Sequence, residues 1–296
     1  MNVSHKNPII CWFSGGVTSA VSCKLAIDIF GLDKCVVVMI DTHNEDDDSY
    51  RFMRDCSNWY GTTIHQISNK NYASIEEIWD KFLSLNVANG AICSAEAKRA
   101  VRIEYQKTHP YFAQVFGFDI HESRRAEAMK LNYPDSKPIF PLLMFGYSKK
   151  DCINIIGDAG IVVPNSYRYG YLNNNCFKTM CVQGGIGYWQ KVKIDFPDKY
   201  EKMAQKEHEL TDKKGKPVTM LKDQSKEAKK LVEETGDKSH QLIFLKPHPD
   251  YPNIKDLSMM KGRPPKPLME CNGFCGIDDL EIKKKQNSSS ELNFEE

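Results

Sequence analysis

An apolar run that breaks into glycines near the amino end constrains the fold of this chain most strongly. Residues 9–13 read Ile-Ile-Cys-Trp-Phe, the pattern of a buried strand, and Ser14, Gly15 and Gly16 follow as a turn before a helical pattern begins. Glycine lets the backbone approach an anion closely, and the N–H groups at a helix start favour negative charge. The run therefore predicts a phosphate-binding turn between a strand and a helix, with Thr18 and Ser19 adding hydroxyl donors. A turn of the same shape without a ligand is the structural alternative.

The turn follows neither the Walker pattern Gly-x-x-x-x-Gly-Lys-Ser/Thr nor the dinucleotide pattern Gly-x-Gly-x-x-Gly. Residues 14–19, Ser-Gly-Gly-Val-Thr-Ser, instead resemble the PP-motif, Ser-Gly-Gly-x-Asp-Ser, of the adenine nucleotide α-hydrolase-like superfamily. That superfamily includes ATP pyrophosphatases, thiolation enzymes and phosphoadenosine phosphosulfate reductases. The chain departs from the motif at Thr18, where many members carry an aspartate. The departure removes a carboxylate that could organise Mg²⁺ around a triphosphate, so it weakens the case for ATP pyrophosphatase chemistry but not for anion binding.

Composition is that of a globular enzyme. The 296 residues are 41% hydrophobic, enough for one large domain with an extension. The net charge of +1 gives no overall attraction to nucleic acid or to an anionic membrane. No apolar run approaches the roughly 20 residues that span a bilayer, and the first residues lack the apolar region of a signal peptide. We therefore expect a cytoplasmic location and no membrane partner.

Strand and helix patterns alternate along the first half of the chain. The alternation predicts an α/β fold, a parallel sheet with helices on both faces, within a nucleotide-binding domain at residues 1–145. A helical and irregular extension with paired cysteines follows at 146–280, and its first helix is predicted to be capped by Ser148 and Asp151. Residues 281–296 are charged and Ser-rich, which predicts a disordered tail. Strands are expected over residues 8–13, 35–40, 62–67 and 111–118, and helices over 18–30, 48–60, 74–85 and 95–107.

Ligands of such sheets bind at the carboxyl ends of the strands, where three polar clusters fall. The first is the turn at 14–19. The second, after the strand at 35–40, contains Asp41, Thr42 and Glu45. The third follows the strand near residue 118 and contains, in order, Gly117, Glu122, Arg124 and Arg125. Solvated loops would explain any one cluster, but their shared location favours a common site.

These clusters extend the resemblance to phosphoadenosine phosphosulfate reductases, over about residues 8–210. Asp41-Thr42 with Glu45 is similar to the strand-2 Asp-Thr-Gly segment, near which that family holds adenine and ribose. Residues 93–99, Cys-Ser-Ala-Glu-Ala-Lys-Arg, resemble the segment that places a basic residue, here Lys98, near the anionic groups. Residues 117–125 resemble the Gly-x-x-x-x-Glu-Ser-x-Arg segment, whose arginine would meet phosphate or sulfate. The resemblance implies catalytic roles for Lys98 and Arg125, and Cys93 is a candidate reactive thiol or substitute metal ligand.

Structural alternatives remain for these residues. Lys98 and Arg102, with Arg99 and Glu96, could form a solvated helix face, the usual explanation of a mixed charge run. Glu122 could cap the helix that follows it. Of Arg124 and Arg125, one is expected to face solvent, and the sequence does not indicate which.

The chain has ten cysteines, which favours metal ligands or redox groups over disulfides in a reducing compartment. Two close pairs, Cys176 with Cys181 and Cys271 with Cys275, would supply four thiolates to a zinc site or an iron–sulfur cluster. A redox thiol pair or unlinked structural cysteines are the alternatives. Residues 173–189, around the first pair, resemble a bacterial and phage branch of reductase-like proteins. Packing in the core is expected for Cys11, Cys23, Cys35, Cys56 and Cys152.

Together these features predict an enzyme that binds an adenine nucleotide, ATP or an adenylyl sulfate, for sulfur transfer or acceptor adenylylation. The alternatives are thiol-dependent reduction of an adenylyl sulfate, and a non-catalytic nucleotide-binding partner in a nucleic-acid modification or defence system. A sulfur-donor or thiol-reductant protein would be the partner of the enzyme. The basic, Pro-rich segment at 261–267 is predicted to be extended, and a solvated linker is favoured over a contact with nucleic acid.

Overall fold

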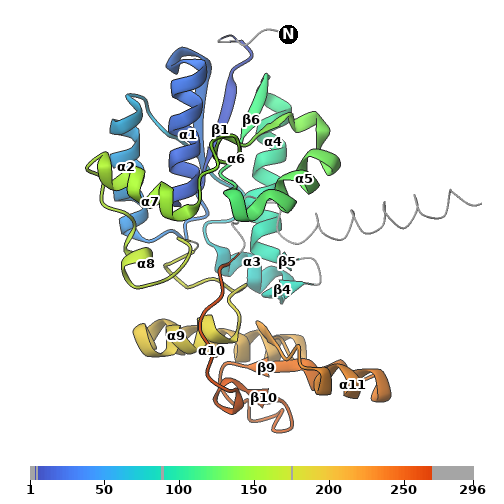
Figure 1. The fold of residues 1–296 in the computed structure, drawn as a ribbon. Coiled ribbons are helices and arrows are strands. Elements are labelled where there is room, and N and C mark those ends of the chain that lie inside the picture. The colour runs from blue at the N-terminus through green and yellow to red at the C-terminus, as the bar shows by residue number, and fades with distance from the viewer. Residues whose placement is uncertain (1–3, 5, 88–89, 175, 269–296) are drawn as a thin grey trace, which may run out of the picture.

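Five parallel strands form the sheet at the centre of the first lobe, in the order β3-β2-β1-β6-β7 (Figure 1). The central strand, β1, pairs with both neighbours, so that Ile9 lies opposite Cys35 on one side and Ala113 on the other. The structure is a computed structural model that describes residues 4, 6–87, 90–174 and 176–268. The strand bounds are β1 Ile9–Phe13, β2 Cys35–Ile40, β3 His65–Ile67, β6 Ala113–Val115 and β7 Pro138–Ile139.

Helices cover both faces of this sheet, which confirms the predicted α/β class. Alternate side chains of a strand point to opposite faces, and those of β1 divide between two cores. Ile9, Cys11 and Phe13 pack with α1, α2 and α7, whereas Ile10 and Trp12 pack with α5. The helix bounds in this lobe are α1 Val17–Phe30, α2 Asp47–Tyr60, α4 Ala100–Thr108, α5 Ser123–Asn132, α6 Pro141–Phe145 and α7 Lys149–Asp158, with short 3₁₀ turns η1 Leu32–Lys34, η3 Ile120–Glu122 and η4 Pro134–Ser136.

Two strands, β3 and β6, are shorter than the sequence pattern predicts. The strand expected over residues 62–67 begins at His65, and the strand expected over 111–118 is regular only from Ala113 to Val115. β7 lies at the edge of the sheet and contains Pro138, which has no N–H to donate and is therefore confined to edges. Hydrogen bonds continue the pairing beyond β6, because the Phe116 N–H donates to the Ile139 carbonyl at 3.0 Å.

The segment between β3 and β6 departs most from the expected secondary structure. α3 (Ile75–Phe82) begins after Ser74, whose side chain accepts the Glu77 N–H, and a hairpin of β4 (Asn86–Val87) and β5 (Gly90–Ala91) follows. Ser94–Arg99 then form a π-helix, η2, where the sequence predicts α-helix, and α4 continues from it. Short π-helical segments are rare and occur frequently at functional sites. This one carries Lys98.

A second lobe lies below the sheet in the view of Figure 1, and the short helix α8 (Asn165–Arg168) precedes it in the chain. A small sheet in the order β10-β9-β8 packs there with two helices, α9 and α10. α3 of the first lobe contributes Trp79 to the same core, which also buries Trp189. The bounds are α9 Ile186–Asp195, α10 Pro197–Lys214, α11 Lys226–Thr235, β8 Leu221–Lys222, β9 Leu242–Phe244 and β10 Lys255–Asp256, with 3₁₀ turns η5 Lys238–Gln241 and η6 Leu257–Met259.

Packing crosses the predicted domain boundary between residues 145 and 146. α7, which begins after that boundary, buries Cys152 and Ile156 against α1 of the first lobe. The predicted cap of this helix is confirmed: the Ser148 hydroxyl accepts the Asp151 N–H, and the Asp151 carboxylate accepts the Ser148 N–H at 2.8 Å. The division into domains stays a prediction.

A buried glutamate ties the second lobe together. Glu207 of α10 is fully buried, and its two carboxylate oxygens accept the backbone N–H groups of Met220 at 2.7 Å and Leu245 at 2.6 Å. Burial raises the pKa of Glu207 to about 8, although both hydrogen bonds act to lower it. This side chain therefore joins α10 to the segments that carry β8 and β9.

The basic, Pro-rich segment lies along α9, although most of its residues are exposed to solvent. The Gln190 side chain donates to the Met260 carbonyl at 3.1 Å and accepts the Arg263 N–H at 3.1 Å. Gly187 permits the close approach, since a Cβ there would lie 2.3 Å from the Pro264 carbonyl oxygen. The segment ends beside the first lobe, where the Leu268 N–H donates to the Asn173 side chain at 2.9 Å. Backbone hydrogen bonds thus hold a segment that has little apolar surface.

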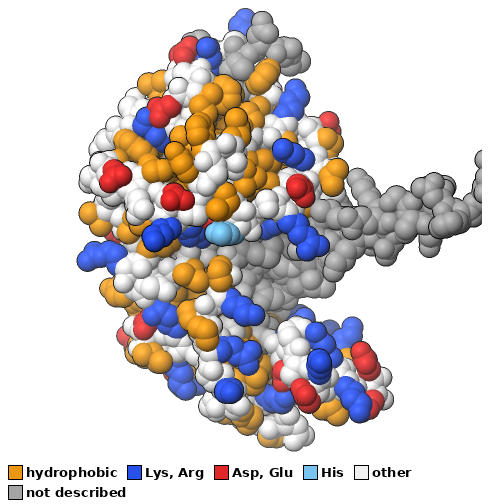
Figure 2. Space-filling view, viewed as in Figure 1, with side chains coloured by type: hydrophobic (Ala, Val, Ile, Leu, Met, Phe, Trp, Pro, Cys, Tyr) orange, Lys and Arg blue, Asp and Glu red, His pale blue; other side chains and the backbone are white. Residues whose placement is uncertain are grey.

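The surface differs between the lobes. Figure 2 shows hydrophobic side chains gathered over the first lobe around α1, α6 and α7, and α6 exposes Met144 and Phe145. Lysine and arginine side chains are spread over the second lobe in the same view. Among the described residues, no helix combines the length and the apolar character that crossing a membrane requires.

Candidate functional site

The predicted anion turn lies between β1 and the start of α1. Gly15 has a φ of +80°, in the left-handed region that favours glycine, and Gly16, the N-cap residue of α1, has no side chain to cap the helix. The hydroxyls of Ser14 and Ser19 shape this turn. Ser19 Oγ accepts hydrogen bonds from the Ser14 N–H and the Ser14 hydroxyl, both at 3.0 Å, and donates to the Gly16 carbonyl at 2.9 Å. Thr18 is fully buried. Phosphate contact by these side chains stays a prediction.

The loop after β2 folds its acidic side chains back onto its own backbone. The Glu45 carboxylate accepts the Thr42 N–H and hydroxyl at 3.0 Å and the Asn44 N–H at 3.1 Å. Asp41 accepts the His43 N–H at 2.7 Å and the Tyr50 hydroxyl at 2.9 Å. His43 has a φ of +58°, a left-handed conformation that is uncommon for a residue other than glycine. Such strained residues cluster at functional sites.

A buried cation lies beside this acidic loop. Burial raises the pKa of Glu45, the positive charge of Lys98 lowers it, and Asp41 raises it again. Lys98 is 8% exposed and Arg102 is 2% exposed, so a solvated helix face is the wrong interpretation for these two side chains. The structure therefore brings Lys98 to the second polar cluster, and its contact with an anionic group of a nucleotide stays a prediction.

Residues of the third cluster take part in more packing and capping contacts with their neighbours than the sequence indicates. A Cβ on Gly117 would lie 2.6 Å from the Ser19 backbone, so glycine here lets β6 approach the start of α1. Glu122 completes a capping box with Asp119 around the 3₁₀ turn η3, whereas its side chain makes no cap hydrogen bond to α5, the helix that follows it. Arg125 pairs with Glu122, and its guanidinium lies 4.7 Å from the Phe118 ring centroid. Arg124 is the exposed member of the arginine pair.

The three clusters follow β2, β1 and β6, which are adjacent and parallel. Their carboxyl ends therefore lie along one edge of the sheet. At the β2 end, a cavity of about 340 Å³ is lined by His43, Glu45, Asp46, Asp47, Tyr50 and Lys178. This volume is within the range of small-ligand sites. A larger hollow of about 560 Å³ lies on α2 beside Arg51 and Trp59, and no predicted site residue lines it.

Segments from outside the sheet complete the site, and the sequence analysis did not single them out. The Lys178 N–H donates to the Asn44 carbonyl at 3.3 Å, and the Asn44 side chain donates to Thr179 at 2.8 Å. Asn174 donates to the Gly15 carbonyl at 2.9 Å, and the Tyr167 hydroxyl accepts the Val17 N–H at 3.3 Å. The run of asparagines at 173–175 is the sequence signal that could have pointed to them.

Magnesium has few protein ligands available at this edge. The first turn of α1 carries no acidic residue. Both Glu45 oxygens accept hydrogen bonds from the loop, and an oxygen of Asp41 accepts two. Because Mg²⁺ is commonly bound through substrate phosphates and water, these residues fit an ion held mainly by the ligand.

The predicted thiol ligands are partly described. Cys181 is buried and Cys176 is partly exposed, and both lie close enough to Tyr188 for their charges to raise the pKa of that phenol, after the larger effect of burial. Cys271 and Cys275 lie outside the described residues. Within the described residues, no third histidine, cysteine or acidic ligand atom joins the first pair to within 4.8 Å.

The remaining cysteines pack as the sequence predicts. Cys93 is 8% exposed and belongs to the second-lobe core, which Cys181 and Cys176 also contact. Reactivity of Cys93 stays a prediction. Burial in the first lobe is confirmed for Cys11, Cys23, Cys35, Cys56 and Cys152.

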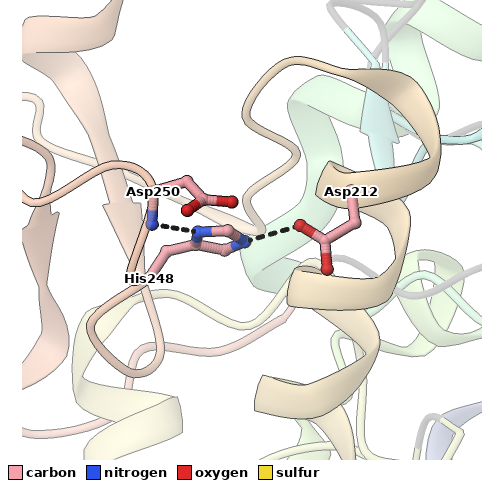
Figure 3. A group of neighbouring side chains, drawn as sticks. All are labelled: Asp212, His248 and Asp250. Atoms are coloured by element: carbon pink, nitrogen blue, oxygen red, sulfur yellow. Dashed lines mark hydrogen bonds and ion pairs between the residues drawn. The ribbon is translucent and has the colours of Figure 1, made fainter.

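A different group, Asp212, His248 and Asp250, places one ligand atom from each side chain within 4.8 Å of the others (Figure 3). His248 is 3% exposed, and its Nε2 lies 3.2 Å from Asp212 Oδ1. The Asp250 N–H donates to His248 Nδ1 at 3.2 Å. Because Nδ1 accepts this hydrogen bond, the neutral ring carries its proton on Nε2 and has no lone pair there for a metal. The group fits an anchor of the loop after β9 on α10 better than a metal centre.

Comparisons with known proteins find likenesses only among solved structures. No protein-family model matches this chain, and no curated protein does either. A crystal structure of phosphoadenylyl-sulfate (PAPS) reductase from Candida auris, in a phosphate complex, is similar over 55% of this chain and 79% of that one, with 18% sequence identity and a TM-score of 0.42. The α/β class of this chain rests on its own strand order and helix layers.

Proposed function

We propose that this chain is an adenine-nucleotide-binding enzyme of the phosphoadenosine phosphosulfate reductase-like group, acting on ATP or an adenylyl sulfate. The observation that carries the proposal is that two features lie side by side at one sheet edge: a turn with backbone N–H donors, and an acidic loop beside a buried cation. A glycine turn precedes α1, and the neighbouring β2 loop holds partly buried Glu45 within the field of buried Lys98. Backbone donors and a fixed cation suit a phosphate or sulfate, and the cavity beside Tyr50 suits a base or sugar.

Each residue has a role in this proposal. The N–H groups at the start of α1 hold the terminal phosphate or sulfate, and Lys98 neutralises its charge. Arg125, held against Phe118 and Glu122, is placed to meet the same anion from the β6 side. Asp41 and Thr42 hold the ribose or adenine, as the family resemblance implies.

Two reactions are compatible with such a site. In acceptor adenylylation, a nucleophile attacks the α-phosphorus of ATP and pyrophosphate leaves, after which a sulfur-donor protein can complete the transfer. In reduction of an adenylyl sulfate, a thiol-reductant protein supplies the electrons and sulfite leaves. Purified protein incubated with each nucleotide separates them by its product. Binding of nucleotide without either product favours the third candidate, a non-catalytic partner in a nucleic-acid modification or defence system.

Binding itself is tested most sharply at Lys98. Lys98→Ala should weaken ATP binding by about tenfold or more, because a charge-assisted contact to phosphate is lost, and should leave adenosine binding nearly unchanged. Lys107→Ala is the matched control, since Lys107 lies in the last turn of α4 and is exposed. Titration calorimetry with ATP and adenosine gives both affinities. An equal loss for the two ligands would contradict the assignment of Lys98 to the anion.

We also propose that Cys176 and Cys181 share a zinc ion or an iron–sulfur cluster with Cys271 and Cys275. Support comes from the anchor at Leu268, whose N–H bonds the Asn173 side chain. Leu268 and Asn173 each precede a proposed ligand by three residues, and three residues of extended chain span at most about 11 Å. Thiolates are suitable ligands for either centre.

A further inference from the structure

A short segment from outside the sheet covers the anion turn. We define residues 165–174, which include α8, as the cover segment. Asn174 is 8% exposed, and its amide donates to the Gly15 carbonyl and to Ser49 Oγ, both at 2.9 Å. Its carbonyl oxygen accepts the Ser166 hydroxyl at 2.9 Å. The side chain is therefore fixed over the turn by three hydrogen bonds.

The cover segment also uses a backbone donor that an anion would need. The Val17 N–H, at the first position of α1, donates to the Tyr167 hydroxyl at 3.3 Å. Residues 15–19 of the turn are all buried, with Thr18 at 0% and Ser19 at 1% exposure. The Val17 N–H is therefore not available to a phosphate while its contact with Tyr167 is in place.

We propose that the cover segment is a gate that competes with the anion for the turn, an inference that rests on the proposed nucleotide function. When a phosphate or sulfate enters, its oxygens take the Val17 N–H from Tyr167, and Asn174 leaves Gly15. A hydrogen bond from an N–H to a charged oxygen is stronger than one to a neutral hydroxyl, so the exchange is favourable at the donor. The broken Asn174 contacts reduce the apparent affinity, because only the open state binds the anion.

The gate has one fixed end. The Asn165 N–H donates to the Asp48 carboxylate at 2.6 Å, and Arg51 donates to the Val162 carbonyl at 2.8 Å. The Asp48 and Arg51 side chains both belong to α2, which packs against the sheet. Opening therefore displaces the part of the segment after Asn165, where Tyr167 and Asn174 lie, while its start stays on α2.

The direction of the affinity change tests the gate. Asn174→Ala and Tyr167→Phe each remove a contact of the closed state, so each should bind ATP about fivefold more tightly than the unmodified protein. Matched controls make the same chemical changes outside the cover segment. Asn71→Ala removes an exposed amide, and Tyr111→Phe removes a hydroxyl that donates to the Asp135 carbonyl. Neither control should change ATP affinity.

Titration calorimetry gives the affinities, and hydrogen exchange of residues 165–174 should become faster when ATP is added to the unmodified protein. Unchanged or weaker ATP binding by both folded variants would overturn the gate, while ATP binding by the unmodified protein would leave the nucleotide function standing. An absence of ATP binding in the unmodified protein and in both variants would overturn both. Tyr167→Phe keeps the ring, so it carries the test if Asn174→Ala fails to fold.

Discussion

Each lobe holds a glutamate away from most of the solvent, Glu207 fully and Glu45 partly buried, and the two side chains are held in different ways. Glu207 in the second lobe accepts N–H groups from Met220 and Leu245, which lie 13 and 38 residues away in the chain. Glu45 in the first lobe is held locally. Among the backbone N–H groups of the described residues, only those of Thr42 and Asn44 donate to it. Burial raises the pKa of both carboxyls.

The comparison shows that burial and a raised pKa do not by themselves mark a functional acid. Glu207 has no cationic neighbour among the causes of its shift, and its contacts join distant segments. Glu45 lies beside Lys98, lines a cavity and shapes a loop with a strained residue, His43. We therefore assign Glu207 to stability and Glu45 to the site.

The largest expected effect is on the free energy of unfolding, and it distinguishes the structural role of Glu207 from the site role of Glu45. Glu207→Ala leaves two buried N–H groups without an acceptor and should lower the free energy of unfolding by about 4 kcal/mol. Glu45→Ala should cost about 1 kcal/mol, since its loop can rearrange locally. Urea denaturation measures both, with Glu209→Ala as the control for an exposed ion pair with Lys206, expected within about 0.5 kcal/mol. An equal loss at positions 45 and 207 would remove the distinction.

A second test compares the thiols of the two regions. Cys176→Ser should lower the metal content of anaerobically purified protein and reduce the free energy of unfolding by about 3 kcal/mol, because metal binding is linked to folding. Cys56→Ser should leave the metal content unchanged, since Cys56 is buried in the first-lobe core. Elemental analysis with a visible spectrum distinguishes zinc from an iron–sulfur cluster. Full metal content in Cys176→Ser would refute the shared site.

A smaller effect appears in the pH dependence of stability. The pKa of Glu207 is about 8 in the folded protein, against an ordinary value of 4.5. Between these values the folded state keeps a proton that the unfolded state releases, so the free energy of unfolding should fall as the pH rises from about 4.5 to about 8. The fall should exceed about 1.4 kcal/mol, the equivalent of one pKa unit. In Glu207→Gln this component should vanish, and identical pH profiles would show that Glu207 does not titrate there.

The sequence predicted the parts of the fold that local pattern determines. Residues 9–20 form the strand, turn and helix expected of them, and the cap of α7 by Ser148 and Asp151 is present. Glycine turns, side-chain caps and apolar alternation each depend on only a few neighbouring residues. They can therefore be recognised in a single sequence. The family resemblance predicted Lys98 at the anionic groups of a nucleotide, whereas its position beside Glu45 was not predicted.

The cover segment and the role of Glu207 could not be predicted in this way. Tyr167 and Asn174 meet the turn from 150 and 159 residues away. Such contacts depend on how the second half folds back over the sheet, and an aromatic or amide side chain in a loop has no pattern that indicates its target. The π-helix at Ser94–Arg99 was missed because its residues have ordinary α-helical propensities.

A crystal structure of the protein with bound ATP tests the central claim most directly. The account predicts a phosphate within hydrogen-bond distance of the Val17 N–H, the Tyr167 hydroxyl displaced from it, and the base near the cavity beside Tyr50. Phosphates bound elsewhere, such as the hollow beside Arg51, with the turn still closed by Asn174, would contradict it.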